Sequence, residues 1–348
     1  MAPRSAARDP GLVRRHLGHA RRFPDAHVGW LPFALAAARR EPYAVAYSSS
    51  GPFTSHLVGL VLKRVTGRPW VAELRDGWYR WNRAIFPDYP AWRDALERRI
   101  EAAAIRAADR VVLVTERMAV AFREQYADLQ ASHFAVVPNG FDPAQFRACA
   151  TASERPRSDD WVVLHAGALY YGRSLTAFLE AVQQLVGKDA EFARDFRLRL
   201  LGTLDAAARV EVERSGLGAR IEVVAQASHT AAIQAMRSAD ALLLVANTTP
   251  GAEATVPGKL FEYLAVGRPV LAMAPRESST ADVLRQTGGG WLVDASDADA
   301  LACALRRAYS ERTTPTDAEA VNAFDRRRLT WQLAQLFDEV LANAARRL

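Results

Sequence analysis

Short apolar segments alternate with helix-like segments along almost the whole chain, and this alternation limits the fold more than any other feature. Six such segments in the second half have strand length: Trp161–His165, Leu198–Leu201, Ile221–Val224, Ala241–Ala246, Val270–Ala274 and Trp291–Val293. Four occur in the first half: Tyr43–Tyr47, Trp70–Leu74, Arg110–Thr115 and Phe134–Val137. Strands separated by helices form parallel, doubly wound sheets. The sequence therefore predicts an α/β fold of two Rossmann-like domains facing across a cleft.

The boundary between the two domains is predicted in a polar stretch. The turn-forming residues Asn139 to Pro143 are followed by the polar segment Thr151 to Asp160, and domain boundaries usually fall in such linkers. We therefore expect a first domain over residues 1–141, a linker over 142–160, a second domain over 161–325 and a closing helical segment over 326–348. The closing segment carries an apolar stripe, which needs a partner surface.

Composition narrows the class of protein. Half of the 348 residues are hydrophobic, as in a packed globule. No apolar run approaches the roughly 18 residues that cross a bilayer, and Met1 to Arg15 contains no apolar signal-peptide core. The two cysteines, Cys149 and Cys303, have no metal-binding or redox spacing, which fits a reducing compartment. The expected location is the cytoplasm.

The net charge of +6 is compatible with nucleic acid, anionic lipid or phosphorylated small molecules as partners. Arginine is spread over many segments and no nucleic-acid-binding module is recognisable, so nucleic acid is not expected. Residues 11–22 form a basic amphipathic pattern. Such a pattern indicates either an ordinary surface helix or one that lies on an anionic membrane. Both interpretations stay open.

The strand Ala241–Ala246 leads into a loop and a helix that suit an anion. Pro257 and Gly258 are predicted to open the helix. Ligands bind at the carboxyl ends of strands in doubly wound sheets, and the free N–H groups of a helix N-terminus favour an anion there. Lys259 adds a positive charge, and Glu262 can accept hydrogen bonds from hydroxyls. Phosphate and hydroxyls together indicate a nucleotide sugar; the alternative is a solvated surface loop.

These residues are part of the longer motif Pro257-Gly258-Lys259-x-x-Glu262-Tyr263-Leu264-Ala265-x-Gly267-Arg268-Pro269-Val270. It resembles the donor-binding segment of family-four-like glycosyltransferases, which are retaining enzymes with the GT-B fold. Many of them hold the donor with two glutamates eight positions apart. Glu262 matches the second, whereas Ala254 occupies the position of the first and Glu253 lies one residue away.

The same resemblance implies a role for the loop after Trp161–His165. Gly167 allows close approach of a ligand, and Arg173 offers a planar fork for phosphate oxygens. In the family, a glycine and a basic residue here meet the donor diphosphate. Arg173 and Lys259 would then clamp one diphosphate from two loops, so neither a metal nor another cofactor is expected.

Two further motifs have more than one interpretation. Ser228 lies in a loop that borders the nucleoside base in the family, and is predicted to be a helix N-cap. The triplet Asp297-Ala298-Asp299 matches a metal-binding motif of a different glycosyltransferase fold, and is predicted here to start a helix, where acidic residues favour the dipole.

On the acceptor side, Arg75-Asp76-x-Trp78 resembles a segment of one subgroup of the family, and Ser49 and Ser50 resemble its acceptor-side loop. The carboxylate of Asp76 can orient or deprotonate an acceptor hydroxyl. The alternative is that Asp76 pairs with Arg75 or caps a turn.

The resemblance spans residues 23–345 and implies a retaining glycosyltransferase. It would move a sugar from a nucleotide diphosphate donor to a hydroxyl acceptor, free or lipid-linked, in surface polysaccharide or glycolipid assembly. The family opens with a strand and a glycine-rich loop that this sequence does not show, so the first domain is predicted to be incomplete at its N-terminus. The closing helix is expected to pack back on the first domain. Two alternatives stay open, a non-catalytic nucleotide-sugar-binding homologue and a sugar-nucleotide epimerase.

Overall fold

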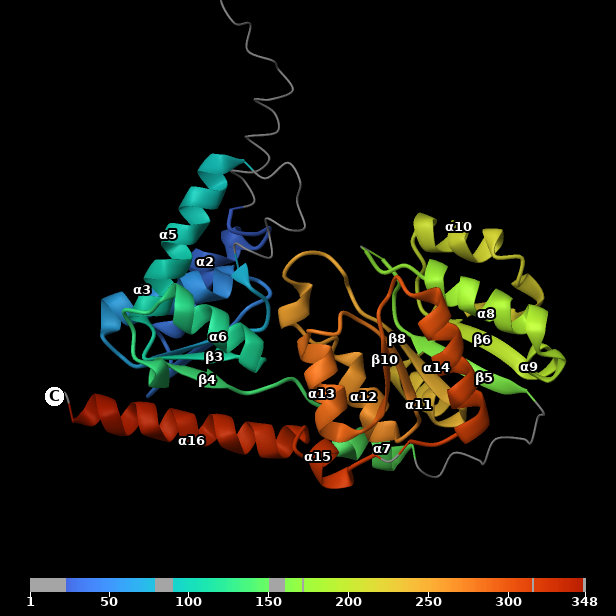
Figure 1. Ribbon diagram of the computed structural model, residues 1–348. Helices are drawn as coiled ribbons and strands as arrows, with labels where there is room; N and C mark the ends of the chain where they lie inside the picture. The colour runs from blue at the N-terminus through green and yellow to red at the C-terminus, as the bar shows by residue number, and fades with distance from the viewer. Residues whose placement is uncertain (1–22, 79–89, 150–159, 171, 315, 347–348) are drawn as a thin grey trace, which may run out of the picture. The chain divides into compact units, whose positions relative to one another are not determined.

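The computed structural model describes residues 23–78, 90–149, 160–170, 172–314 and 316–346 (Figure 1). The basic amphipathic pattern at residues 11–22 lies outside these ranges. Contacts divide the chain into two compact units. Unit 1 comprises Met1–Val137 with Gln332–Leu348, and unit 2 comprises Pro138–Trp331. This division falls a few residues before the predicted linker, and each unit is described by itself below.

Unit 1 is built on a parallel sheet of four strands in the order β1-β2-β3-β4. The strands are β1 (Ala46–Ser49), β2 (Trp70–Leu74), β3 (Arg110–Leu113) and β4 (Phe134–Val136), and the helices are η1 (Val28–Trp30), α2 (Leu31–Ala38), α3 (Thr54–Thr66), α5 (Ala91–Ala107), α6 (Glu116–Gln125) and η2 (Ala131–His133). Crossover helices make the sheet parallel, as the alternation in the sequence predicts.

The first strand lies later than predicted. The sequence places it at Tyr43–Tyr47, but β1 runs from Ala46 to Ser49. Its pairing with β2 puts Ala46 opposite Trp70, and the Nε1–H of Trp70 donates to Ser48 Oγ at 2.9 Å. A buried polar partner thus satisfies the serine inside the sheet, and tertiary pairing overrides the low strand propensity of this residue type.

Unit 2 contains a parallel sheet of six strands in the order β10-β9-β8-β5-β6-β7. The strands are β5 (Trp161–Ala166), β6 (Phe196–Leu201), β7 (Ile221–Val224), β8 (Ala241–Val245), β9 (Val270–Met273) and β10 (Gly290–Val293). The predicted α/β class and the numbers of strands in the two sheets, four and six, are confirmed within the described residues. The chain order reverses between β5 and β8, and ligands bind beside such a switch point at the carboxyl edge.

Helices cover both faces of the second sheet (Figure 1). The helices of unit 2 are α7 (Pro143–Ala148), α8 (Thr176–Lys188), α9 (Ala190–Asp195), α10 (Ala206–Arg214), η3 (Gly218–Arg220), α11 (His229–Ser238), η4 (Ala252–Ala254), α12 (Lys259–Val266), α13 (Ser279–Thr287), α14 (Ala298–Glu311) and α15 (Ala318–Asn322), and the closing helix α16 (Arg326–Ala345) begins in this unit. Side chains alternate between the faces of a strand. Val163 accordingly packs in one apolar cluster with α8 and α14, and Leu164 packs in the other with α11 and α12.

Most of the closing helix α16 is assigned to unit 1. The ring of Phe337 meets the ring of Tyr47 edge-on at 5.4 Å, and Leu336 and Val340 are buried. The apolar stripe of this helix therefore has apolar partners. Over the ranges that the structure describes, no helix combines the length and the apolarity needed to cross a bilayer.

Candidate phosphate-binding site

A hollow of about 570 Å³ lies at the carboxyl edge of the second sheet. The loops after β5, β6 and β7 and the start of α12 contribute to its lining, which includes Gly167, Gly202, Gln226, His229, Lys259 and Glu262. All belong to unit 2. The hollow therefore occupies the edge at which doubly wound sheets bind ligands.

Lys259, the first residue of α12, contributes a buried ammonium group to this hollow. Its Nζ atom is buried and has no hydrogen-bond partner in the described part of the chain. Burial and, to a smaller extent, the positive charge of Arg173 lower the pKa of Lys259 to about 8, while Glu262 acts in the opposite direction. A desolvated ammonium group with unused donors at a helix N-terminus is a strong attractor of an anion.

Gly167 makes room for that ammonium group. A Cβ atom at this position would collide with Nζ of Lys259, and the backbone has φ +127°, a region that residues with side chains rarely adopt. The loop is held by a hydrogen bond from Gly167 N–H to Leu201 O at 2.7 Å. The family resemblance implies that Gly167 and Lys259 contact one diphosphate from two different loops. In the structure these two residues lie side by side.

Arg173 is close enough to act electrostatically on the same site. Its charge lowers the pKa of both Lys259 and His165. The guanidinium group lies over the ring of Tyr170, 4.9 Å from the centroid, and donates to Ala168 O at 3.3 Å. Its Nε atom is buried without a partner among the described residues. Like charges repel, so two neighbouring cations with unused donors are best explained by an anion that binds near both.

Two side chains that the sequence analysis did not assign support the loop after β5. The hydroxyl of Tyr263, on α12, accepts from Ala166 N–H at 2.8 Å. The ring of His165 donates from Nδ1 to Leu243 O at 2.9 Å, and burial lowers its pKa to about 3, so the ring is neutral. Both residues lie within or beside the motifs quoted above, but only their contacts across strands reveal the role.

Glu262 meets a residue that sequence reasoning missed. Its Oε1 atom lies 3.1 Å from Nε2 of His229, at the start of α11, and both side chains are partly exposed in the hollow. Glu253, the neighbour of the substituted position Ala254, accepts from Gly251 N–H at 2.8 Å and is exposed. The carboxylate of Glu253 thus caps its own turn.

The predicted helix boundaries around the site hold with small shifts. Gly258 is the N-cap of α12, so Pro257 precedes the first turn instead of lying in it, and its carbonyl accepts from Leu260 N–H at 2.9 Å. Ser228 is the N-cap of α11, as predicted, and accepts from Ala231 N–H at 3.2 Å. The triplet Asp297-Ala298-Asp299 starts a helix, as predicted, and Asp297 is the N-cap of α14.

The predicted acceptor-side residues lie in unit 1, at the carboxyl ends of β1 and β2. Burial raises the pKa of Asp76, and the charge of Arg75 opposes this shift. Ser49 donates from its hydroxyl to the carboxylate of Glu73, and Ser50 Oγ accepts from Arg75 N–H at 2.9 Å. Within unit 1 the four residues are therefore neighbours, and both serines already have protein partners.

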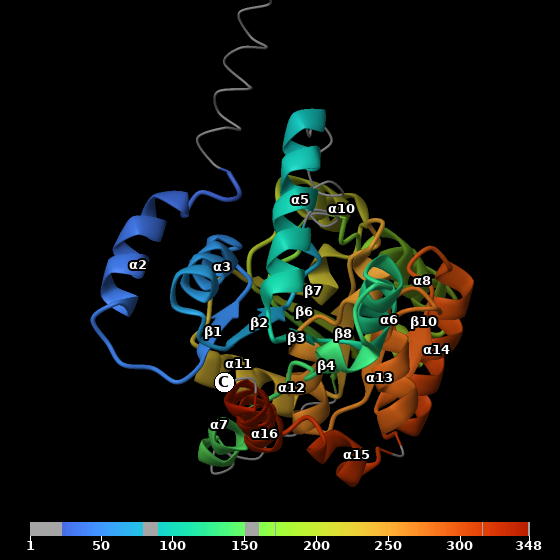
Figure 2. The ribbon, with the colours of Figure 1, turned by 90° about the vertical axis from the view of Figure 1, so that its left-hand side faces the viewer.

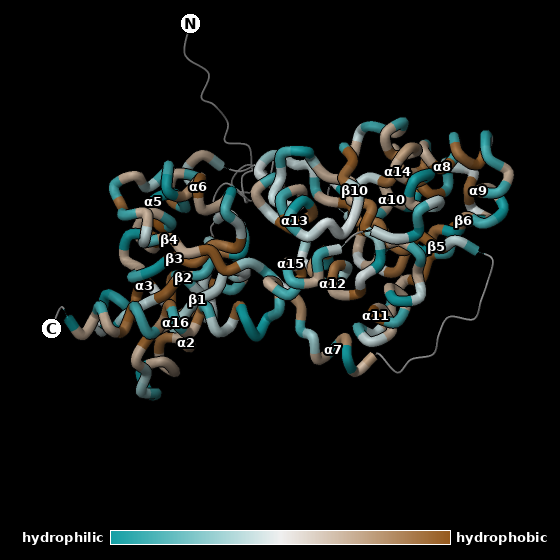
Figure 3. Tube along the Cα trace, turned by 60° about the horizontal axis from the view of Figure 1, so that its bottom comes forward, coloured by the Kyte–Doolittle hydropathy of each residue, from teal (hydrophilic) through white to brown (hydrophobic). Residues whose placement is uncertain are grey.

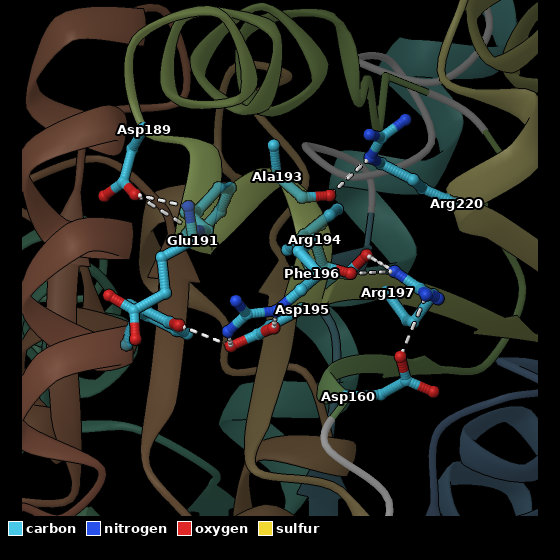
Figure 4. Close-up of polar contacts among 11 residues, drawn as sticks. Asp160, Asp189, Glu191, Ala193, Arg194, Asp195, Phe196, Arg197 and Arg220 are labelled. Atoms are coloured by element: carbon cyan, nitrogen blue, oxygen red, sulfur yellow. Dashed lines mark hydrogen bonds and ion pairs between the residues drawn. The ribbon is translucent and has the colours of Figure 1, made fainter.

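A second hollow, of about 280 Å³, lies at the opposite, amino-terminal edge of the second sheet. Its three arginines already have protein partners, and Figure 4 shows those of Arg197 and Arg220. Arg197 pairs with Asp160 at 2.9 Å and Arg220 donates to Ala193 O at 3.0 Å. Arg199 pairs with Glu222 at 2.6 Å. This hollow therefore lacks the unused cation that distinguishes the first one.

Comparisons with known proteins agree on one family. Residues 160–311 match the family model described as glycosyl transferases group 1, and residues 2–145 match the one described as glycosyltransferase family 4. No curated protein matches the chain in sequence.

Solved structures agree on the fold. Sucrose-phosphate synthase from Thermosynechococcus elongatus is 22% identical, with a TM-score of 0.65 over 91% of this chain and 79% of that one. Anabaena HepE, in complex with UDP-glucose, is 19% identical with a TM-score of 0.64 over 89% and 82%. UDP-GlcNAc 2-epimerase from Methanocaldococcus jannaschii is 13% identical with a TM-score of 0.56 over 90% and 82%. At these identities the likeness shows the fold alone.

Proposed function

We propose that this chain, which belongs to the family-four-like glycosyltransferases of the GT-B fold, transfers a sugar from a nucleoside diphosphate donor to a hydroxyl acceptor with retention of configuration. One observation carries the proposal: the buried Nζ of Lys259 has no partner among the described residues and faces the backbone of Gly167. A diphosphate would supply the missing acceptors.

The reaction breaks the bond between the anomeric carbon and the β-phosphate oxygen and forms a bond from that carbon to the acceptor oxygen. Negative charge builds on the leaving diphosphate as the bond breaks. Lys259, Arg173 and the N-terminus of α12 would stabilise this charge more in the transition state than in the ground state. Two fixed cations can neutralise a diphosphate, so the proposal includes no metal requirement.

Glu262 would bind hydroxyls of the sugar or the ribose, since its carboxylate lines the hollow beside the phosphate position. The acceptor hydroxyl must lose its proton during transfer, and Asp76 is the candidate for orienting or deprotonating it. Its raised pKa, caused by burial, suits a group that takes up a proton.

For the acceptor we propose a glycan or glycolipid hydroxyl in surface polysaccharide assembly, with transfer on the cytoplasmic side. The family resemblance is the support for this acceptor class. The donor has a second support, because Anabaena HepE, one of the structural neighbours, was solved in complex with UDP-glucose. A nucleotide sugar is therefore the donor class to test first.

Calorimetric titration with UDP, GDP and ADP tests the donor site. We expect wild type to bind at least one of them, and Lys259→Ala to weaken that binding. Lys188→Ala is the matched control, because Lys188 is exposed on α8. Failure of all three nucleotides to bind would sink the proposal.

Turnover of the matching nucleotide sugar separates the candidate functions. A transferase releases nucleoside diphosphate faster when acceptor hydroxyls are present, whereas an epimerase changes the sugar without acceptor and a binding protein does neither. The measurement is repeated with EDTA, and unchanged turnover is expected because Lys259 and Arg173 supply the positive charge.

A further inference from the structure

The loop after β5 presents Tyr170 and Arg173 from a backbone that is fixed on both sides. β5 itself is mostly apolar, as its colouring in Figure 3 shows. Leu169 is fully buried, and its backbone exchanges two hydrogen bonds with the loop after β6, at 2.9 and 3.0 Å. Farther along the loop, the hydroxyl of Thr248 donates to Gly172 O at 3.3 Å. The loop therefore has a defined position from which these two side chains project.

Within the described ranges, only neutral groups hold Arg173 near Lys259. The guanidinium group lies over the ring of Tyr170, 4.9 Å from the centroid, and its hydrogen bond to Ala168 O is long, at 3.3 Å. The two cations are close enough for the charge of Arg173 to lower the pKa of Lys259. Because like charges repel, an attractive contact must offset this repulsion, and the ring of Tyr170 provides one.

Other arginines of unit 2 are held differently. Arg197 pairs with Asp160 at 2.9 Å, and Arg199 pairs with Glu222 at 2.6 Å. A carboxylate in contact with Arg173 would cancel its charge and compete with a bound diphosphate. An aromatic face attracts a cation through the ring quadrupole, which leaves both the charge and the N–H groups available.

We propose that Tyr170 is a positioning residue of the diphosphate site, whose ring holds the guanidinium group of Arg173 beside Lys259 without cancelling its charge. A donor then meets two cations that are already in place, so less side-chain freedom is lost when it binds. The effect on donor binding rests on the proposed function, whereas the contact itself is measurable in the free protein.

The protonation of Lys259 reports where Arg173 lies. Burial and, to a smaller extent, the charge of Arg173 lower the pKa of Lys259 to about 8, and Glu262 opposes them. His165, which also senses the charge of Lys259, stays neutral because burial lowers its pKa to about 3. Displacing the guanidinium group should therefore raise the pKa of Lys259.

NMR titration of protein labelled with ¹³C-lysine measures this change without a ligand. The sequence contains three lysines, Lys63, Lys188 and Lys259, and Lys259→Met assigns the signal. We expect this signal to titrate near pH 8 in wild type and at higher pH in Arg173→Ala. Tyr170→Leu should reproduce most of that rise. Tyr170→Phe, which keeps the ring, should titrate like wild type.

Calorimetry with UDP, GDP and ADP measures the consequence for binding. For a nucleotide that wild type binds, Tyr170→Leu should weaken the affinity about two- to fivefold at pH 7, as expected for a cation–π contact at an exposed site. Tyr170→Leu/Arg173→Ala should bind no more weakly than Arg173→Ala, because Tyr170 acts through Arg173. The loss should shrink above pH 8, where the lysine of Tyr170→Leu keeps its proton longer than that of wild type.

Tyr43→Leu is the matched control. Arg68 lies over the ring of Tyr43, 4.7 Å from the centroid, in unit 1. Tyr43 lies between α2 and β1, and Arg68 lies between α3 and β2 (Figure 2). This variant loses a similar contact and should change neither the titration of Lys259 nor the nucleotide affinity. Tyr170 is 50% exposed, so thermal unfolding of Tyr170→Leu should match that of wild type.

Three results would overturn the proposal. In the first, Arg173→Ala raises the pKa of Lys259 and Tyr170→Leu leaves it unchanged. In the second, Tyr170→Phe behaves like Tyr170→Leu, which would assign the role to the hydroxyl group. In the third, the affinity losses of Tyr170→Leu and Arg173→Ala add. If wild type binds none of the three nucleotides, the proposed function fails, and the lysine titration still decides whether Tyr170 positions Arg173.

Discussion

The Nζ atom of Lys259 occupies the space that a Cβ atom at position 167 would need. Position 167 therefore requires glycine for two reasons. A side chain there would displace Lys259, and the backbone of this residue has φ +127°. The pair joins the first loop of the second sheet to the start of α12. The first three predictions below depend on this contact or on the buried charge of Lys259.

The first prediction concerns Gly167→Ala. The methyl group would displace Lys259 and impose an unfavourable φ, so nucleoside diphosphate affinity should fall at least tenfold by calorimetry. Gly187→Ala is the control: Gly187 lies in α8 with open space around its Cβ direction, and alanine should stabilise the helix by about 0.5–1 kcal/mol. Equal affinity of Gly167→Ala and wild type would show that the diphosphate does not use this contact.

The second prediction separates turnover from affinity. Lys259→Ala and Arg173→Ala should each lower turnover by roughly a hundredfold or more, the usual loss when one transition-state stabiliser is removed. Affinity for the free nucleotide should fall less, because charge on the diphosphate is largest when the sugar leaves. Steady-state kinetics and titration of the same variants make the comparison. Full activity of Lys259→Ala would refute the clamp.

The third prediction is a proton taken up on binding. Burial and Arg173 lower the pKa of Lys259 to about 8 in the free protein, so a growing fraction is neutral above that pH. A bound diphosphate favours the charged form and raises this pKa. Binding at pH 8.5 should therefore take up protons, and affinity should decrease as the pH rises through 8. Calorimetry in buffers of different ionisation enthalpy measures the uptake, which should disappear in Lys259→Met.

The fourth prediction concerns Glu262→Gln. If the carboxylate contacts the donor sugar, the affinity for the nucleotide sugar should fall more than the affinity for the free nucleotide. Parallel titrations with both ligands decide this. An equal loss for both ligands would place Glu262 on the ribose instead. His229→Ala reports whether the 3.1 Å pair with His229 positions the carboxylate.

The fifth prediction is a stability profile in acid. Burial lowers the pKa of His56 and of His165 to about 3, whereas an unfolded histidine titrates near 6.5. Between these values the unfolded state binds more protons, so the free energy of unfolding is complete above pH 6.5 and decreases as the pH falls toward 3.

His56→Asn isolates one of the two histidines. The side-chain oxygen of the asparagine can replace Nδ1 of His56, which lies 2.8 Å from Ser48 Oγ. The slope of unfolding free energy against pH should fall by about 1.4 kcal/mol per pH unit. Urea unfolding between pH 4 and 6 measures it, and an unchanged slope would mean that His56 is accessible to protons in the folded state.

The alternation of apolar segments predicted the fold class and the number of strands in each sheet, and local residues predicted several helix ends. These features depend on neighbours in sequence: Ser228 and Asp297 cap helices through N–H groups three residues away, and Gly267 ends α12 with φ 75°. The candidate phosphate-binding residues Gly167 and Lys259 could also be proposed from sequence, because each follows a strand in a recognisable loop.

Tertiary structure decided what those residues touch. The strand order places β8 beside β5, which brings Lys259 against Gly167 and Tyr263 against Ala166, although each pair is distant in sequence. The same packing buries the lysine charge beside Arg173 and brings His229 to Glu262. Pairing with β2 also decided that the first strand includes Ser48 and Ser49, instead of ending at the predicted Tyr47. Burial and charge proximity arise only when separate segments pack together, and no local pattern encodes them.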